Sequence, residues 1–112
     1  MLDPLAGRLE QYMDLLSTRQ KLVASNIANA DTPGYKTKDI DFQNEFLNAA
    51  AEIAPHVIEA RDLAARNDGN NVSIDREARL LAENDLRFNI ATNLLRGQIR
   101  TVREAIQEGK GA

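Results

Sequence analysis

The chain has 112 residues, so we expect a single small domain spanning 1–112. Its apolar residues are mostly Ala, Leu, Ile and Val, with three Phe, two Tyr and no Trp, which favours helices packed along seams over an aromatic core. The absence of cysteine excludes disulfides and thiolate metal sites, and the net charge of −3 gives no reason to expect a nucleic-acid partner. The first residues hold no uninterrupted apolar run, so neither a Sec-type signal peptide nor direct membrane insertion is predicted.

The N-terminal part of the chain has the apolar spacing of an amphipathic helix. Its apolar residues recur at intervals of three and four, with one gap of seven. They are Leu2, Leu5, Leu9, Tyr12, Leu16, Val23, Ile27 and Ala30. Asp3 is suited to cap the helix, and Pro4 to occupy the first helical position, where a missing N–H costs nothing. We therefore expect an N-terminal helix within residues 1–31.

The C-terminal part of the chain repeats with a period of seven. The apolar residues at this spacing are Ile74, Leu81, Phe88, Leu95 and Val102. A seven-residue spacing held over four heptads is typical of a coiled-coil seam. Gly109 and Gly111 are weak helix formers and predict the end of the element. We expect a second helix over residues 73–108.

Two long helices with single apolar faces predict an all-α fold, in which the helices pair as an antiparallel, coiled-coil-like hairpin. The predicted seam comprises Leu9, Leu16, Val23 and Ile27 from the first helix and Leu81, Phe88, Leu95, Ile99 and Val102 from the second. A lone hairpin covers only half of each face, so the pattern indicates that other chains complete the packing. Two functions fit this pattern: a subunit of a larger assembly, or a soluble hairpin module that binds one protein partner.

The connector over residues 32–72 is less regular. A short helix is predicted to begin after Asp39 or Asp41 and to end before Pro55, with its apolar side at Phe42, Phe46, Leu47, Ala50 and Ile53. A turn at Asp68-Gly69 then predicts a small β-hairpin within residues 56–72. The residues Gly69, Asn70 and Asn71 form the junction between this connector and the second helix.

The chain lacks the residue sets that enzymes and metal sites need. His56 is the only histidine, and no serine lies in the sequence context of a nucleophile, so no catalytic residues are predicted. If Gly69 is aligned with the glycine of a calcium-binding loop, Ala64 and Arg66 occupy ligand positions and supply no side-chain oxygen. We therefore expect neither a metal site nor a cofactor.

Three arginines near the C-terminus, Arg96, Arg100 and Arg103, fall on one side of the second helix. A phosphate-binding stripe is one interpretation, and a contact between subunits is another. The pattern favours a third, in which basic residues near a helix C-terminus interact well with the helix dipole and keep the surface soluble. Interleaved acids and the lack of an aromatic stacking platform count against nucleic-acid binding.

Residues 25–36 read SNIANADTPGYK and end the first predicted helix with an unusual set of side chains. The polar and turn-forming residues are Asn26, Asn29, Thr32, Pro33, Gly34 and Tyr35. The asparagines and the threonine, three residues apart, would share one helix face. Pro33 followed by Gly34 predicts a type II turn, in which glycine supplies a positive φ. An ordinary helix end and a site for close packing against other subunits both fit these residues.

This stretch resembles the N-terminal signature of bacterial flagellar rod and hook proteins. That signature runs Asn, any two, Asn, any two, Thr, any, Gly, Tyr, and all five defining positions match as Asn26, Asn29, Thr32, Gly34 and Tyr35. The segments KDIDFQNEF and DGNNVSIDREARLLAENDLRFNIATNLL are also similar to a short proximal rod protein. Because distal rod and hook proteins carry large inserted domains, the length of the chain favours the proximal members, of which there are two siblings.

The resemblance implies a structural subunit without catalysis. Such proteins are exported by the flagellar type III system, and their terminal helices, commonly disordered before assembly, stack into the helical tube of the periplasmic rod. That tube links the membrane-ring and export-gate complex to the distal rod. The implied partners are other rod subunits, further copies of the chain, the adaptor FliE and the membrane-ring and export-gate proteins. The signature residues would then contact a neighbouring subunit.

Overall fold

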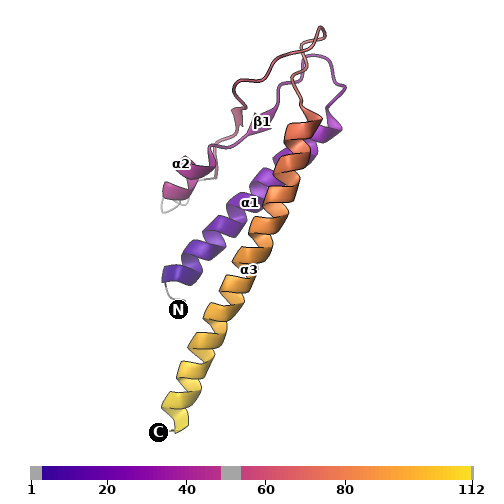
Figure 1. The fold of residues 1–112 in the computed structure, drawn as a ribbon. Coiled ribbons are helices and arrows are strands. Elements are labelled where there is room, and N and C mark those ends of the chain that lie inside the picture. The colour runs from indigo at the N-terminus through magenta and orange to yellow at the C-terminus, as the bar shows by residue number, and fades with distance from the viewer. Residues whose placement is uncertain (1–3, 49–53, 112) are drawn as a thin grey trace.

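The computed structural model describes residues 4–48 and 54–111 and confirms the all-α class. Two long helices, α1 (Pro4–Ala28) and α3 (Ile74–Gly111), lie side by side and antiparallel (Figure 1). The start of α1 and the end of α3 lie toward the same end of the hairpin. The turn after α1 and the loop before α3 lie at the opposite end, and the part of the connector with α2 runs back beside α1. The molecule is a rod-like hairpin with extents of 71 × 26 × 18 Å.

Helix α1 ends at Ala28, before the predicted limit of 31. Residues 29–31 form turns instead, because the Asn29 side chain competes with the backbone: its Nδ2 donates to the Ser25 carbonyl at 2.8 Å. Pro33, without an N–H, could not have continued the helix. The predicted cap Asp3, like Leu2, lies outside the described residues.

Helix α3 begins where the sequence predicts and extends beyond the predicted end. Ser73 caps it, with its Oγ accepting from the Arg76 amide at 3.2 Å and its carbonyl from the Glu77 amide at 3.0 Å. The helix continues to Gly111, so Gly109 does not end it. At about 1.5 Å per residue, α3 is longer than α1 by roughly 20 Å, and its C-terminal part extends past the start of α1 (Figure 1).

The connector holds one short helix and a minimal sheet. Helix α2 (Phe42–Leu47) is capped by Asp41, whose Oδ1 accepts from the Asn44 amide at 3.3 Å, and this confirms the predicted start. The helix ends at Leu47, well before Pro55; Ala50 and Ile53 fall outside the described residues. Strand β1 (Lys38–Asp39) pairs antiparallel with β2 (Ile58–Glu59). The two strands of this sheet therefore lie on either side of α2 in the sequence. The β-hairpin expected around Asp68-Gly69 within residues 56–72 is absent among the described residues.

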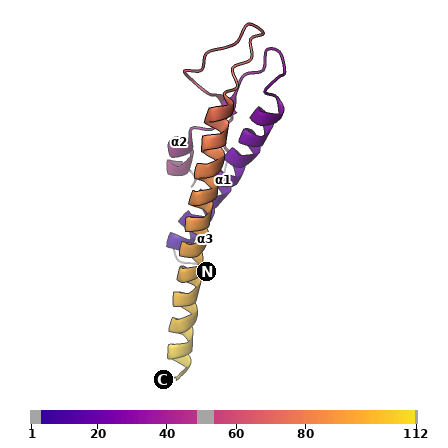
Figure 2. The ribbon, with the colours of Figure 1, turned by 45° about the vertical axis from the view of Figure 1, so that its right-hand side comes forward.

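Aromatic side chains hold α2 against α1. Figure 2 shows the short helix α2 beside the hairpin of α1 and α3. The Tyr12 ring makes edge-to-face contacts with Phe42 and Phe46, at centroid distances of 5.4 and 5.8 Å. The Arg8 guanidinium lies 4.3 Å from the centroid of the Phe46 ring. Across the helix pair, Arg87 of α3 donates to the Tyr12 hydroxyl at 3.3 Å, so this tyrosine joins three helices.

The contact between α1 and α3 uses a different row of α3 from the predicted one. On α1, Leu15, Leu16 and Val23 are buried, as are Ala6 and Asn26. On α3 the buried row is Glu77, Asn84 and Ala91, which repeats every seven residues but lies three positions after Ile74, Leu81 and Phe88. Small and polar side chains let the helices approach closely, and the larger apolar residues flank the contact.

The predicted seam is therefore only partly covered within the chain. Leu16 and Val23 are buried, and Leu9 and Leu95 are half-buried. The remaining seam residues keep between 39% and 42% of their surface exposed; they are Ile27, Leu81, Phe88, Ile99 and Val102. Within residues 4–48 and 54–111, no helix combines the length and apolar character needed to cross a membrane.

Candidate functional site

The buried side chain of Asn26 makes the backbone hydrogen bonds to β1 that a further β-strand would make. The bond from the Ala60 amide to the Thr37 carbonyl, at 2.8 Å, turns both backbone groups of Lys38 away from β2. Asn26 satisfies both of them: its Nδ2 donates to the Lys38 carbonyl at 2.8 Å, and its Oδ1 accepts from the Lys38 amide at 3.0 Å. The amide is fully buried and also bonds Glu77 and Tyr35, so it makes all four of its hydrogen bonds.

The segment after α1 forms the predicted type II turn. The Tyr35 amide donates to the Thr32 carbonyl at 3.2 Å, with Pro33 and Gly34 between them, and Gly34 has a φ of +74°. The turn directs Tyr35 back onto the helix that it follows. There its hydroxyl donates to Asn26 Oδ1 at 3.0 Å and lies 3.3 Å from the Ser25 hydroxyl.

Asn70 caps the open end of α1. Its buried Nδ2 donates to the Asn29 and Thr32 carbonyls, at 2.9 and 2.8 Å. Each of these carbonyls also accepts a backbone amide in the turns after α1, from Thr32 and Tyr35 respectively. Its Oδ1 accepts from the Val72 amide at 2.8 Å and so shapes the approach to α3. One side chain therefore joins the end of the first helix to the start of the second.

Asn71 binds the same loop from the other side. Its Oδ1 accepts from the Thr37 amide at 2.6 Å and from the Thr37 hydroxyl at 2.8 Å, and both residues are buried. Its backbone amide donates to the Tyr35 carbonyl at 3.2 Å. We call this set of residues, which joins the two ends of the connector, the loop junction. It consists of Asn26, Tyr35, Thr37, Asn70 and Asn71.

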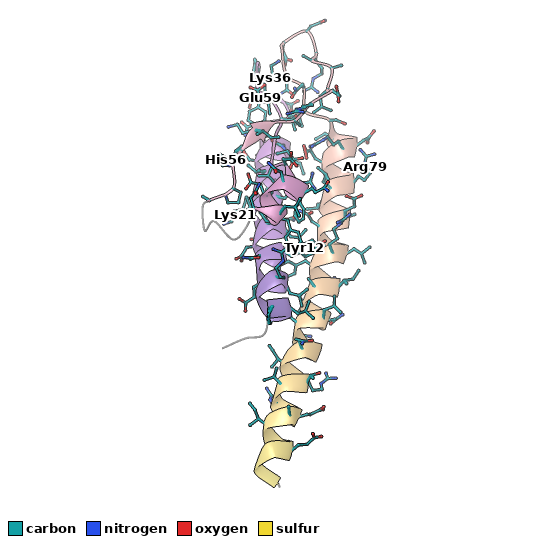
Figure 3. The ribbon with its side chains drawn as sticks, turned by 90° about the vertical axis from the view of Figure 1, so that its left-hand side faces the viewer. Tyr12, Lys21, Lys36, His56, Glu59 and Arg79 are labelled. Carbon is teal, nitrogen blue, oxygen red and sulfur yellow. The ribbon has the colours of Figure 1, made fainter. Side chains whose placement is uncertain are left out.

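Two glycines allow the backbones to meet at the loop junction. The Gly34 amide donates to the Asp68 carbonyl at 2.8 Å, and a Cβ on Gly69 would lie 3.4 Å from Gly34 Cα. Gly69 has a φ of +83°, a conformation that other residues rarely adopt. The Lys36 ammonium, at the loop end of the molecule in Figure 3, donates to the Gly69 carbonyl.

A charged cluster lies beneath the loop junction. Asp39 accepts two hydrogen bonds from Arg19, at 3.0 and 2.9 Å, and one from Arg76 at 2.5 Å. Burial by itself raises the pKa of Asp39, but these bonds and one from the Ile40 amide outweigh it, so the pKa lies below its usual value. Asp39 thereby connects α1, β1 and α3.

Glu77 is the buried acid of the helix contact. Its Oε1 accepts from Asn26 at 2.9 Å and from Arg76 at 2.8 Å, whereas its Oε2 has no hydrogen-bond partner among the described residues. Burial raises the pKa of Glu77 above its usual value, against the opposing effects of Arg76 and Asn26. The bond between Asn26 and Glu77 sets the register of the hairpin at its loop end.

Comparison with known proteins relates this geometry to a family. Residues 13–36, which cover the second half of α1 and the turn, match the family described as "Flagella basal body rod protein". The chain is 33% identical to the flagellar basal body rod protein FlgB of Yersinia ruckeri, over 97% of this chain and 100% of the relative. The chain belongs to the FlgB family. The Escherichia coli K12 and Bacillus subtilis FlgB proteins are 31% and 29% identical to it, over 97% and 91% of this chain.

The FlgB family is a structural one, so the loop junction is to be understood as architecture and not as an active site. The alignment with the Yersinia ruckeri FlgB protein extends over 137 positions, more than the 112 residues of this chain, so the chain is shorter than that relative. The names of these relatives favour FlgB over FlgC, its sibling in the proximal rod.

Within this FlgB-family chain, the signature residues divide into two groups. Asn26 and Tyr35 are directed inward and bond to the chain itself. The tip of the turn is exposed and comprises Thr32, Pro33 and Gly34, whereas Asn29 is half-buried. The family resemblance implies that the signature residues contact a neighbouring subunit, and that contact stays a prediction. Within the chain itself, the buried Asn26 makes all four of its hydrogen bonds.

Other residues considered from the sequence lie away from the loop junction. His56 is an exposed loop residue whose Nδ1 lies 3.1 Å from Glu45 Oε1. Arg96, Arg100 and Arg103 are exposed on α3. Among residues 4–48 and 54–111, no three His, Cys, Asp or Glu side chains gather as metal ligands would. The charged cluster around Asp39 was not predicted, because no local pattern brings Arg19 and Arg76 to one carboxylate.

Proposed function

We propose that the chain is a structural subunit of the proximal rod of the flagellar basal body and assembles through its terminal helices into a helical tube. The observation that carries this proposal is the match to FlgB relatives over nearly the whole chain, combined with helices that remain half covered. Leu81 and Phe88 flank the hairpin contact, and Ile99 and Val102 lie beyond it, all four with about two-fifths of their surface exposed. Neighbouring subunits would bury these side chains.

The loop junction gives such a subunit a rigid end. Buried asparagines fix the turn after α1 against the residues before α3, so the exposed tip at Thr32, Pro33 and Gly34 keeps one position relative to both helices. A fixed tip is a suitable contact for a neighbouring subunit, because little conformational entropy is lost when it binds. The signature would therefore act in assembly through its exposed tip, supported by its buried members.

The proposal extends to location and partners. The chain would be exported by the flagellar type III system and occupy the periplasmic rod, between the membrane-ring and export-gate complex and the distal rod. Its partners would be further copies of itself, other rod subunits and the adaptor FliE. Each helix then gains a covered face only after export, when the neighbours are present.

Purified basal bodies test this proposal. The gene is replaced in its own bacterium by an epitope-tagged copy, and the basal bodies are probed for the tag by immunogold labelling and mass spectrometry. We expect label at the membrane-proximal part of the rod, and no rods in a strain without the gene. A chain that stays soluble as a monomer or dimer bound to one protein, in a strain that remains motile without it, would instead establish a soluble binding module.

A further inference from the structure

Asp68 is followed by Gly69, and this is the only Asp-Gly or Asn-Gly pair in the sequence. The pair lies in the loop before α3, at the loop end of the hairpin (Figure 1), and Asp68 is exposed to solvent. Because glycine has no Cβ, its main-chain nitrogen reaches the side-chain carboxyl carbon of the preceding residue with little steric hindrance. In an unfolded chain, this pair therefore has the geometry needed for succinimide formation.

The reaction needs no partner except water. The Gly69 nitrogen attacks Asp68 Cγ and loses its proton, a carboxyl oxygen leaves as water, and a succinimide ring closes. Water then opens the ring at either of its carbonyl carbons. Cleavage at Cγ restores aspartate, whereas cleavage at the former main-chain carbonyl carbon gives isoaspartate. In isoaspartate the main chain passes through Cβ and Cγ, so it is longer by a methylene group, and the mass of the protein is unchanged.

We propose that Asp68 is a site of spontaneous isoaspartate formation in the unfolded chain, and that closure of the loop junction stops the reaction and excludes its product. The inference goes beyond the proposed function, because it concerns the single chain before any assembly. Both halves of it follow from the hydrogen bonds that the Asp68-Gly69 pair makes in the folded loop.

The folded loop holds both reacting groups in bonds of their own. The Gly69 amide donates to the Arg66 carbonyl at 2.9 Å. A succinimide nitrogen carries no hydrogen, so this bond must be lost when the ring closes. The other reacting group is also held, since Asp68 Oδ1 accepts from the Asn70 amide at 2.9 Å. The reaction therefore proceeds from a locally opened loop, whose population falls as the loop junction becomes more stable.

The loop junction also leaves no room for the longer main chain of isoaspartate. On one side of the pair, the Asp68 carbonyl accepts from the Gly34 amide at 2.8 Å. On the other side, the Asn70 side chain donates to two carbonyls of the same turn after α1. The stretch between these anchor points is tightly placed, because a Cβ on Gly69 would already lie 3.4 Å from Gly34 Cα. An inserted methylene group would therefore break one anchor or press Gly69 against Gly34.

Isoaspartate measured in the purified parent chain tests the first half of the proposal. The chain is incubated at neutral pH in native buffer and in concentrated urea. Isoaspartate is quantified with an isoaspartyl methyltransferase and located by electron-transfer mass spectrometry. We expect it to accumulate at Asp68 in urea, and at least about tenfold more slowly in native buffer, because only the opened loop reacts. Equal rates in the two conditions, or no isoaspartate at Asp68 in urea, would overturn the proposal.

Asn71→Ala shows whether the loop junction itself gives the protection. The substitution removes the side-chain bonds to Thr37, at 2.6 and 2.8 Å, and leaves the Asp68-Gly69 pair intact. The rate in native buffer should rise by about fivefold or more, in keeping with the loss of a buried hydrogen bond. Asn89→Ala, at an exposed position of α3, is the matched control and should keep the parent rate. A parent-like rate in Asn71→Ala would contradict the role of the loop junction.

The second half of the proposal is tested on the parent sequence, so the result does not depend on whether a variant folds. Isoaspartyl chain formed in urea is separated from unmodified chain by chromatography, and both are returned to native buffer. We expect the amides of Gly34 and Asn71, which bond across the loop junction, to exchange hydrogen at least about tenfold faster in the isoaspartyl chain. Equally slow exchange of these amides in the two chains would overturn the exclusion of the product.

Discussion

Asn26→Asp tests the role of the loop junction because it changes one donor group and almost no volume. The new oxygen replaces Nδ2, which donates to the Lys38 carbonyl at 2.8 Å and to Glu77 Oε1 at 2.9 Å. The substitution leaves the Lys38 carbonyl without its donor and places a second carboxylate beside Glu77. Because the site is fully buried, water cannot replace either bond without opening the structure.

The expected cost follows from these two lost bonds. A buried group left without its partner costs about 1–3 kcal/mol, and more where charge is involved. Two such groups amount to roughly 3–5 kcal/mol, against a typical total of about 5–15 kcal/mol for a folded domain. The unfolding free energy is measured by urea denaturation followed by circular dichroism. Asn89→Asp, at an exposed position of α3, is the matched control and should change the unfolding free energy by less than about 0.5 kcal/mol.

The variant also carries a pH signature. The carboxyl that Asn26→Asp introduces is buried beside Glu77, so its pKa should be raised in the folded state, and its protonated form can again donate a hydrogen bond. A group with a raised folded pKa contributes stability at low pH that is lost as the pH rises through that pKa. The stability gap to the parent chain should therefore narrow in mild acid. Equal losses for Asn26→Asp and Asn89→Asp, or a gap that is the same in mild acid and at neutral pH, would refute the reasoning.

Three further changes probe the turn and the charged cluster by chemical denaturation. Gly34→Ala should cost about 1–2 kcal/mol because of the positive φ alone, since no atom lies within 4 Å of the added Cβ, whereas Gly97→Ala within α3 should stabilise by up to about 1 kcal/mol; equal effects at the two glycines would contradict this. Asp39→Asn should cost about 3 kcal/mol by removing the carboxylate that pairs with Arg19 and with one nitrogen of Arg76, and it should remove the part of the stability that the parent chain loses as the pH falls below the ordinary value of 3.8; an unchanged acid transition would count against it. Glu77→Gln should gain stability relative to the parent as the pH rises toward neutral, because the raised pKa of Glu77 makes its charged form the costly one; a constant difference across that range would be the contrary result.

Local signals in the sequence were sufficient to predict the helices. The period-seven row and the Ser73 cap define the start of α3, and Pro33-Gly34 defines the turn after α1. These features depend on residues close together in the chain. The helix ends were less predictable: Gly109 costs a long helix only about 1 kcal/mol and does not stop it.

The register of the helix contact could not be predicted from apolar spacing alone. The buried positions on α3 include Glu77 and Asn84, which apolar patterns do not count. Their burial depends on partners distant in sequence, such as Asn26 and the Leu16 carbonyl. For the same reason, the inward orientation of Asn26 could not be predicted, because its hydrogen bonds depend on the position of β1.

Hydrogen exchange tests the central claim most directly: one end of the hairpin is fixed by the chain itself and the rest is completed by neighbours. In the isolated chain, we expect slow exchange at the amides of Gly34, Lys38 and Asn71, and fast exchange along residues 99–109. After assembly with rod partners, slow exchange should extend along both α1 and α3 and include residues 99–109. Equal protection of residues 99–109 before and after assembly, or fast exchange at the loop junction in the isolated chain, would contradict the account.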